Sequence, residues 1–253
     1  MQKGIKVFSI GILTGLLVLT FTLFALSEEE KGLVGFWKFD KGEGTVVRDS
    51  SSNKNDGTII KLGKYTKWVD GRFDKALEFD GEGGVENGGV VIKGTNRYDF
   101  SKGITIEAWV KLNDKQVKVW PGFDEIVTNA VKDRGAGFRF LIFYNSLTFW
   151  SGDGEKKWGV RSNQAKYPIK KNVWYHVAGT YDGSVFKVYI NGEEAGVSEE
   201  NLALTKGRDA ITVGSFMSGY AYPFNGIIDE VKIYNYPKSD MDILQDAKGG
   251  IDI

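Results

Sequence analysis

The chain has 253 residues, in which 33 Lys and Arg balance 33 Asp and Glu, with one His and no Cys. Balanced charge gives no basic surface for nucleic acid, and a hydrophobic fraction of 42% is too high for a disordered chain. The absence of Cys excludes disulfide scaffolds and thiol nucleophiles, and a lone His excludes the common catalytic zinc sites. With 33 Gly, 13% aromatic residues and only 4 Pro, the composition predicts many short strands joined by tight turns.

The N-terminal segment has the pattern of an export signal. Lys3 and Lys6 precede an apolar run over residues 7–26, which ends in small residues that suit signal peptidase. We therefore expect residues 1–27 to be a signal peptide and residues 28–32 to be a short acidic linker. The apolar run is also long enough to span a bilayer, so an uncleaved membrane anchor is the alternative. In both cases the rest of the chain is expected outside the cytoplasm, either secreted or at the cell surface.

From Leu33 onward, runs of apolar, β-branched and aromatic residues alternate with turns rich in Gly, Asn and Asp, which is the pattern of antiparallel strands. Residues 104–112 are the clearest case, because one parity is apolar and the other is mixed. Asn191-Gly192 suits a type I′ hairpin turn, so the strands around it are expected to form a meander. The predicted strands are residues 33–40, 76–79, 89–92, 104–112, 125–131, 137–144, 147–151, 173–181, 185–190, 211–214 and 226–234.

One segment, residues 239–247, has the pattern of a helix. Ser239 and Asp242 stand at capping-box spacing, and Gly249-Gly250 follows the last helical residue. The predicted fold class is all-β, a two-layer antiparallel β-sandwich with one short C-terminal helix. Residues 33–247 are expected to form one domain, followed by a tail over residues 248–253.

Six segments carry a resemblance to a known family, in the expected order along the chain. They are GFWKFDKGEG at 35–44, DSSSNKNDG at 49–57, ALEFDG at 76–81, ITIEAWV at 104–110, WYHVAGTYDG at 174–183 and GIIDEVKIYN at 226–235. Together they resemble the LamG-like jelly-roll domain of the concanavalin A-like lectin and glucanase superfamily, from Leu33 to about Gln245. The resemblance implies a jelly roll but leaves function open, since such sandwiches host lectins, hydrolases, lyases and spacers. Ser52 stands where the family loop usually has Gly, and residues 113–123 form a longer and more charged connection.

A structural calcium ion is predicted from the acidic residues of three segments. Asp229 shares strand parity with Ile227 and Val231, so it is expected to point toward the apolar face, where a carboxylate needs a compensating partner. The resemblance implies that the first and last strands are neighbours, which would bring Asp40 close to Asp229. The loop that contains Asp49 and Asn53 offers further oxygen ligands that suit Ca²⁺. Alternatively, these side chains form Asx turns and accept backbone hydrogen bonds.

Four aromatic residues outside clean core parity are the candidate ligand-binding residues. They are Trp120, Trp158, Tyr220 and Tyr222. Flat apolar rings with polar neighbours stack on the faces of sugars at little entropic cost. The alternative is that these rings cover sheet edges or fix their own loops.

No catalytic constellation is evident in the sequence. His176 lies inside a predicted strand, and no Gly-x-Ser-x-Gly turn is present to pair with it. Asp229 and Glu230 are adjacent and are expected on opposite faces, so they would not flank one glycosidic bond. The sequence therefore favours an exported, non-catalytic recognition or adhesion domain that binds a glycan or an extracellular protein, with no nucleic acid partner and with membrane contact only through an uncleaved N-terminal segment. The alternatives are a polysaccharide hydrolase or lyase that uses Glu107, Arg139, His176 or Tyr181, and a purely structural surface domain.

Overall fold

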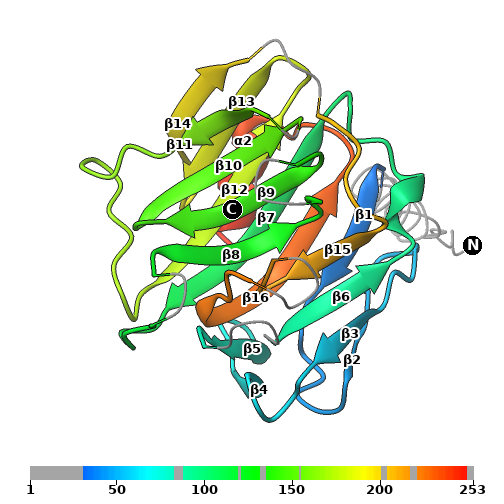
Figure 1. Ribbon diagram of the computed structural model, residues 1–253, viewed down its shortest axis with the longest axis vertical. Helices are drawn as coiled ribbons and strands as arrows, with labels where there is room; N and C mark the ends of the chain where they lie inside the picture. The colour runs from blue at the N-terminus through cyan, green and yellow to red at the C-terminus, as the bar shows by residue number, and fades with distance from the viewer. Residues whose placement is uncertain are drawn as a thin grey trace, which may run out of the picture.

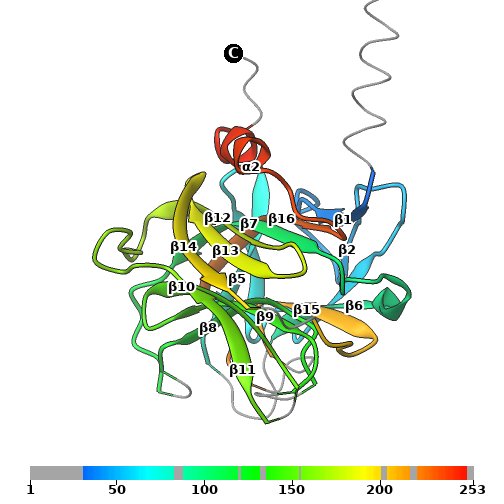
Figure 2. The same ribbon diagram turned by 90° about the horizontal axis from the view of Figure 1, so that it is seen from above.

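The computed structural model describes residues 31–82, 88–118, 121–131, 135–153, 155–200, 204–216 and 221–249. Two antiparallel sheets pack face to face, and a single α-helix lies outside them among these residues (Figures 1 and 2). This confirms the predicted all-β sandwich. The expected signal peptide, residues 1–27, lies outside the described residues. None of the helices in the described ranges is long and apolar enough to cross a membrane.

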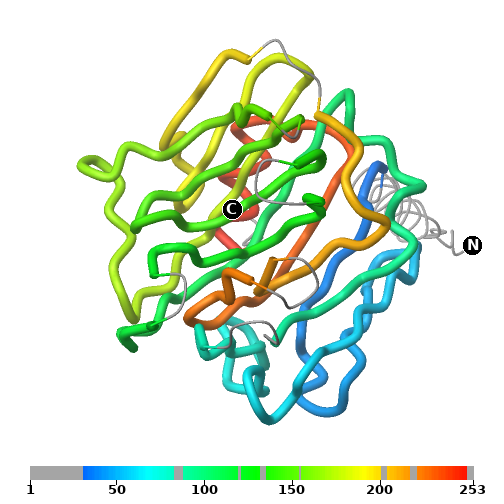
Figure 3. Tube along the Cα trace, in the orientation of Figure 1, coloured from blue at the N-terminus to red at the C-terminus, as the bar shows by residue number. Residues whose placement is uncertain are grey.

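The first sheet, sheet A, has the strand order β14-β13-β12-β7-β16-β5-β4, and β1 also pairs with β16. Its strands are β1 (Leu33–Trp37), β4 (Thr66–Asp70), β5 (Lys75–Asp80), β7 (Ile104–Leu112), β12 (Trp174–Tyr181), β13 (Val185–Ile190), β14 (Glu193–Glu199) and β16 (Asn225–Tyr234). Figure 3 shows the blue segment of β1 running beside the orange segment of β16, the last strand. The expected adjacency of the first and last strands is therefore confirmed.

The second sheet, sheet B, has the order β11-β10-β9-β8-β15-β6-β3-β2. Its strands are β2 (Val46–Val47), β3 (Gly57–Ile60), β6 (Gly89–Lys93), β8 (Phe123–Thr128), β9 (Phe138–Phe143), β10 (Ser146–Gly152), β11 (Lys157–Arg161) and β15 (Ala210–Val213). A short 3-10 helix, η1 (Thr95–Arg97), follows β6. No residue range was predicted for β2, β3, β4, β11 or β14, and all of these except β3 lie at sheet edges and carry few apolar residues.

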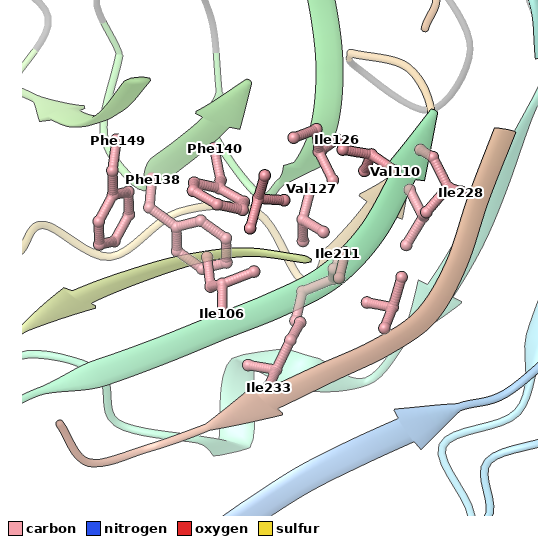
Figure 4. Packing of buried hydrophobic residues seen from close by; sticks show 14 of the residues in the cluster. Ile106, Val110, Ile126, Val127, Phe138, Phe140, Phe149, Ile211, Ile228 and Ile233 are labelled. Atoms are coloured by element: carbon pink, nitrogen blue, oxygen red, sulfur yellow. The ribbon is translucent and has the colours of Figure 1, made fainter. Parts of the chain in front are cut away.

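The core lies between the sheets and is formed by the apolar parity of each strand. Phe138, Phe140 and Phe149 of sheet B point toward Ile106 and Ile233 of sheet A (Figure 4). In β7 the buried core residues are those of the predicted parity, because side chains alternate along a strand.

The helix α2 (Asp240–Ala247) packs on the outer side of sheet A (Figure 2). Ser239 caps it, and the predicted capping box with Asp242 is present. Ile243 is buried against Ala178 and Tyr189 of the sheet, which fixes the helix to that face.

A β-bulge in β16 changes which side chains face the core. Asp229 is opposite Trp109 on β7, but the next paired residue is Lys232, so one residue is inserted at Glu230, whose φ is 52°. The core therefore receives Ile228 and Val231, while Asp229 lies on the outer face. The prediction that Asp229 points to the core face is wrong, because regular alternation does not hold across the bulge.

Candidate ligand-binding surface

Aromatic side chains gather on the outer face of sheet B. Phe123 on β8 is directly opposite Phe143 on β9, and their ring centres are 4.5 Å apart. Tyr222, from the segment before β16, stacks on Phe123 at 4.8 Å with an interplanar angle of 26°. We call this set the aromatic surface; it consists of Phe123, Phe143, Tyr144, Trp150, Phe216 and Tyr222.

A buried ion pair packs against the rings of the aromatic surface. Arg139, opposite Trp150 in the strand register, is 1% exposed and donates from Nε to both carboxylate oxygens of Glu125, at 3.2 and 3.1 Å. Its guanidinium carbon lies 4.4 Å from the centre of the Phe216 ring and 4.7 Å from that of Tyr222. A planar guanidinium held by a carboxylate both neutralises the buried charge and fixes the rings that stack on it.

The rim of the aromatic surface is basic. Lys157 Nζ lies 4.3 Å from the centre of the Trp150 ring, and the guanidinium of Arg161 lies 4.5 Å from that of Phe143. Both residues are on β11, next to β10. Tyr144, at the tip of the β9–β10 hairpin, is 58% exposed. The surface thus offers flat rings in its middle and hydrogen-bond donors at its edge.

Comparison with known proteins identifies the family. The profile of the concanavalin A-like lectin/glucanases superfamily matches residues 83–244. The chain belongs to this superfamily. The resemblance noted in the sequence is therefore confirmed, and no curated protein sequence matches the chain significantly.

The solved structures that are similar to this chain include binding domains. Domain 4 of AbnA, an extracellular arabinanase from Geobacillus stearothermophilus solved with arabinotriose, is similar with a TM-score of 0.64 and 22% identity, over 85% of this chain and 98% of that chain. The binding domain of botulinum neurotoxin DC, solved with rat synaptotagmin II, gives 0.63 and 15% identity over 86% and 51% of the two chains. The same toxin domain solved with SialylT gives 0.63 and 18% identity, again over 86% and 51%. The chain spans about half the length of these toxin domains, and at such identities the likeness shows the fold alone.

Of the four residues predicted to bind a ligand, Tyr222 lies on the aromatic surface. Trp158 does not, because β11 pairs it with Ser151 and thereby turns its ring inward to the core, where it is 8% exposed. Trp120 and Tyr220 lie outside the described residues. The sequence reasoning missed Phe143 and Trp150, although both stand on the polar parity of strands that it did predict.

The four predicted calcium ligands do not converge on one ion. Both oxygens of Asp49 are occupied, since Oδ1 accepts from the backbone N–H groups of Phe36 and Ser51 and Oδ2 accepts from the N–H of Asn55 and the hydroxyl of Ser51. These bonds place Asp49 on the edge of β1 that faces away from β16. Asn53 Nδ2 donates to the carbonyl of Leu33. Among the described residues, no group of three or more His, Cys, Asp or Glu side chains is placed to hold a metal ion.

Asp229 instead anchors the turn between β4 and β5. Its Oδ2 accepts from the N–H groups of Arg72 and Phe73, at 2.8 and 3.1 Å. Burial raises the pKa of Asp229 to about 7, the two backbone bonds act against this increase, and the charge of Asp40 adds to it. Asp40 and Asp229 are thus neighbours, as expected, and the Asx-turn and backbone-acceptor alternative describes both Asp49 and Asp229.

The four residues named for the enzymatic alternative do not form one site. Tyr181 lies in the core and Arg139 pairs with Glu125, whereas Glu107 and His176 meet on the outer face of sheet A, with Nε2 and Oε2 3.2 Å apart. The expectation that Asp229 and Glu230 point to opposite faces is wrong, since the bulge brings both to that outer face.

Proposed function

We propose that this chain is an exported, non-catalytic recognition domain that binds glycans through the aromatic surface. The observation that supports this most strongly is the packing of Phe216 and Tyr222 on the buried Arg139 guanidinium. Rings that are already fixed lose little conformational entropy when a sugar stacks on them, so binding keeps more of its favourable free energy.

The basic rim favours the binding of glycans that carry carboxylate or sulfate groups. Lys157 and Arg161 lie over the rings of Trp150 and Phe143, where they would pair with an anion on a bound sugar. The arabinotriose bound to the arabinanase domain and the SialylT bound to the toxin domain agree with a glycan ligand. The toxin domain was also solved with a protein, synaptotagmin II, so an extracellular protein is the alternative kind of ligand.

A glycan array tests the proposal, followed by titration of the retained oligosaccharides. We expect the Tyr222→Ala variant to bind about tenfold more weakly, since a lost stacking contact corresponds to roughly 1.4 kcal/mol. Tyr65→Ala, which removes a ring in the β3–β4 loop, is the matched control and should bind as wild type. Retention of no glycan, or equal binding by Tyr222→Ala, would contradict the proposal, and release of reducing sugar would favour the enzymatic alternative.

Export is tested separately by mass spectrometry of the mature N-terminus. A peptide that begins at Glu28 is expected from signal peptidase cleavage. Recovery of residues 1–27 on the mature protein would instead indicate the uncleaved anchor.

A further inference from the structure

A hollow lies on the outer face of sheet A, on the opposite side of the sandwich from the aromatic surface. Its volume is about 310 Å³, and it lies near the C-terminal end of α2. Trp109 and Phe73 form its apolar part, and their rings meet edge to face at 6.0 Å. This volume is at the lower end of the range for small-molecule sites and matches a molecule of about one sugar ring.

The bulge in β16 supplies the acidic wall of this hollow. In a regular strand Glu230 would point into the core, but the inserted residue and its left-handed backbone turn the side chain outward to line the hollow. Asp40 and Asp74 line the same wall. Within the described ranges none of these three carboxylates forms an ion pair.

The floor of the hollow is a buried polar network. Glu107 lies 3.2 Å from both His176 Nε2 and Lys238 Nζ, and Lys238 also pairs with Asp246. His176 is 3% exposed and lines the hollow, and its Nδ1 has no hydrogen-bond partner among the described residues. Nε2 faces the Glu107 carboxylate, so Nδ1 is the ring nitrogen left open to the hollow.

The charges of the hollow select a cation. Five carboxylates line it against two lysines, and a further cation, the Arg72 guanidinium, lies 4.7 Å from the centre of the Trp109 ring. Lys232 is held by Asp246 at 3.4 Å, and Lys38 Nζ lies 5.2 Å from the centre of the Phe36 ring. The groups without a partner among the described residues are therefore the wall carboxylates and His176 Nδ1. A ligand that fits must bring hydrogen-bond donors, positive charge and an apolar face.

We infer that this hollow binds a primary ammonium group carried on a small ring, such as a hexosamine with a free amine. The ammonium lies toward Glu230, Asp40 and His176, and the carbon face of the ring lies on Trp109 and Phe73. Ammonium groups are attracted both to carboxylates and to aromatic rings, so one ligand satisfies both parts of the site.

Isothermal titration with glucosamine, N-acetylglucosamine and glucose tests the inference. We expect glucosamine to bind at least about tenfold more tightly than the two neutral sugars, since these lack the ammonium charge. Glu230→Gln and Asp40→Asn keep the shape of the wall and remove charge, and each should weaken glucosamine binding by about fivefold or more. Glu199→Gln, an acid on the exposed edge strand β14, is the matched control and should leave binding unchanged.

Melting temperatures of the variants establish that each remains folded. Equal affinity for the three sugars, or wild-type affinity for glucosamine in folded Glu230→Gln, would overturn the inference. Tyr222→Ala should leave glucosamine binding unchanged, so failure here is distinguishable from failure of the aromatic surface.

Discussion

At the scale of single residues, Arg139 is the side chain on which the aromatic surface depends. Its guanidinium neutralises the buried carboxylate of Glu125 and contacts three aromatic rings. Removing one partner of such a pair leaves an uncompensated charge, so we expect Arg139→Leu to lower the free energy of unfolding by about 3–5 kcal/mol. Urea denaturation measures this change.

The double variant Arg139→Leu/Glu125→Leu separates charge from packing. It should lose less stability than the single variant, because no charge remains buried. Lys75→Met breaks the exposed pair with Asp70 and should cost no more than about 1 kcal/mol. If the single and double variants lose the same free energy of unfolding, an uncompensated buried charge is not the cause of the loss.

Asp229 predicts a pH dependence of stability. Burial raises its pKa to about 7 and that of Asp124 to about 6, both above the ordinary value of 3.8. The folded protein then binds more protons than the unfolded chain between these values, so the stability that these two groups contribute is fully present below pH 4 and is lost as the pH rises toward 7. We expect the free energy of unfolding to fall by on the order of 1–3 kcal/mol over this interval.

Urea denaturation between pH 4.5 and 7.5 measures that slope. Asp229→Asn, which does not titrate, should reduce it and leave the contributions of Asp124 and of Glu230, whose pKa burial also raises to about 7. A slope in the variant that is as steep as in wild type would assign the effect to other groups.

At the scale of elements, the sequence predicted the strands whose faces differ clearly in polarity. In β7 one parity is entirely apolar, and the strand has the predicted bounds. The bulge in β16 was not predictable, because the run from Ile227 to Val231 is compatible with regular alternation and only tertiary pairing shows the inserted residue. The aromatic surface was missed in part because its rings come from strands and from a loop that are distant in sequence.

The junction after β15 shows how closely the two sheets approach. Gly214 has φ of 78°, and a Cβ there would lie 2.2 Å from Cε1 of Phe79, which belongs to the other sheet. Gly214→Ala should therefore lower the free energy of unfolding by about 2–4 kcal/mol, through overpacking and backbone strain together.

Gly63 provides the comparison for this prediction. Its φ is 81°, but nothing lies within 4 Å of an added Cβ. Gly63→Ala should cost only the backbone strain, about 1 kcal/mol. Chemical denaturation of both variants measures the difference, and similar losses would mean that contact with Phe79 relaxes freely.

At the scale of the whole molecule, calcium is tested by thermal stability. An ion that binds only the folded state raises the melting temperature by mass action. Because Asp49 uses its oxygens within its own loop and Asp229 anchors a turn, we expect the same melting temperature in excess calcium and in chelator. A higher melting temperature in calcium would support the calcium ion predicted from the sequence, and its loss in Asp40→Asn would place the ion beside Asp229.

The two proposed sites lie on opposite outer faces, separated by both sheets and the core. The residues between the two sites form a packed core. Within the described residues, this core shows a single packing of side chains, so a ligand has no alternative conformation to stabilise. A coupling free energy requires two states that the ligands bind with different affinities.

We therefore expect the retained glycan to bind with the same affinity, within about twofold, in the absence and presence of saturating glucosamine. Competitive binding of glucosamine at the aromatic surface would weaken the glycan instead, and Glu230→Gln would not relieve that effect. A change of fivefold or more that Glu230→Gln abolishes would show that the sandwich transmits binding from one face to the other. Titration of the glycan into wild type and Glu230→Gln, each with and without glucosamine, gives the four affinities that close this cycle.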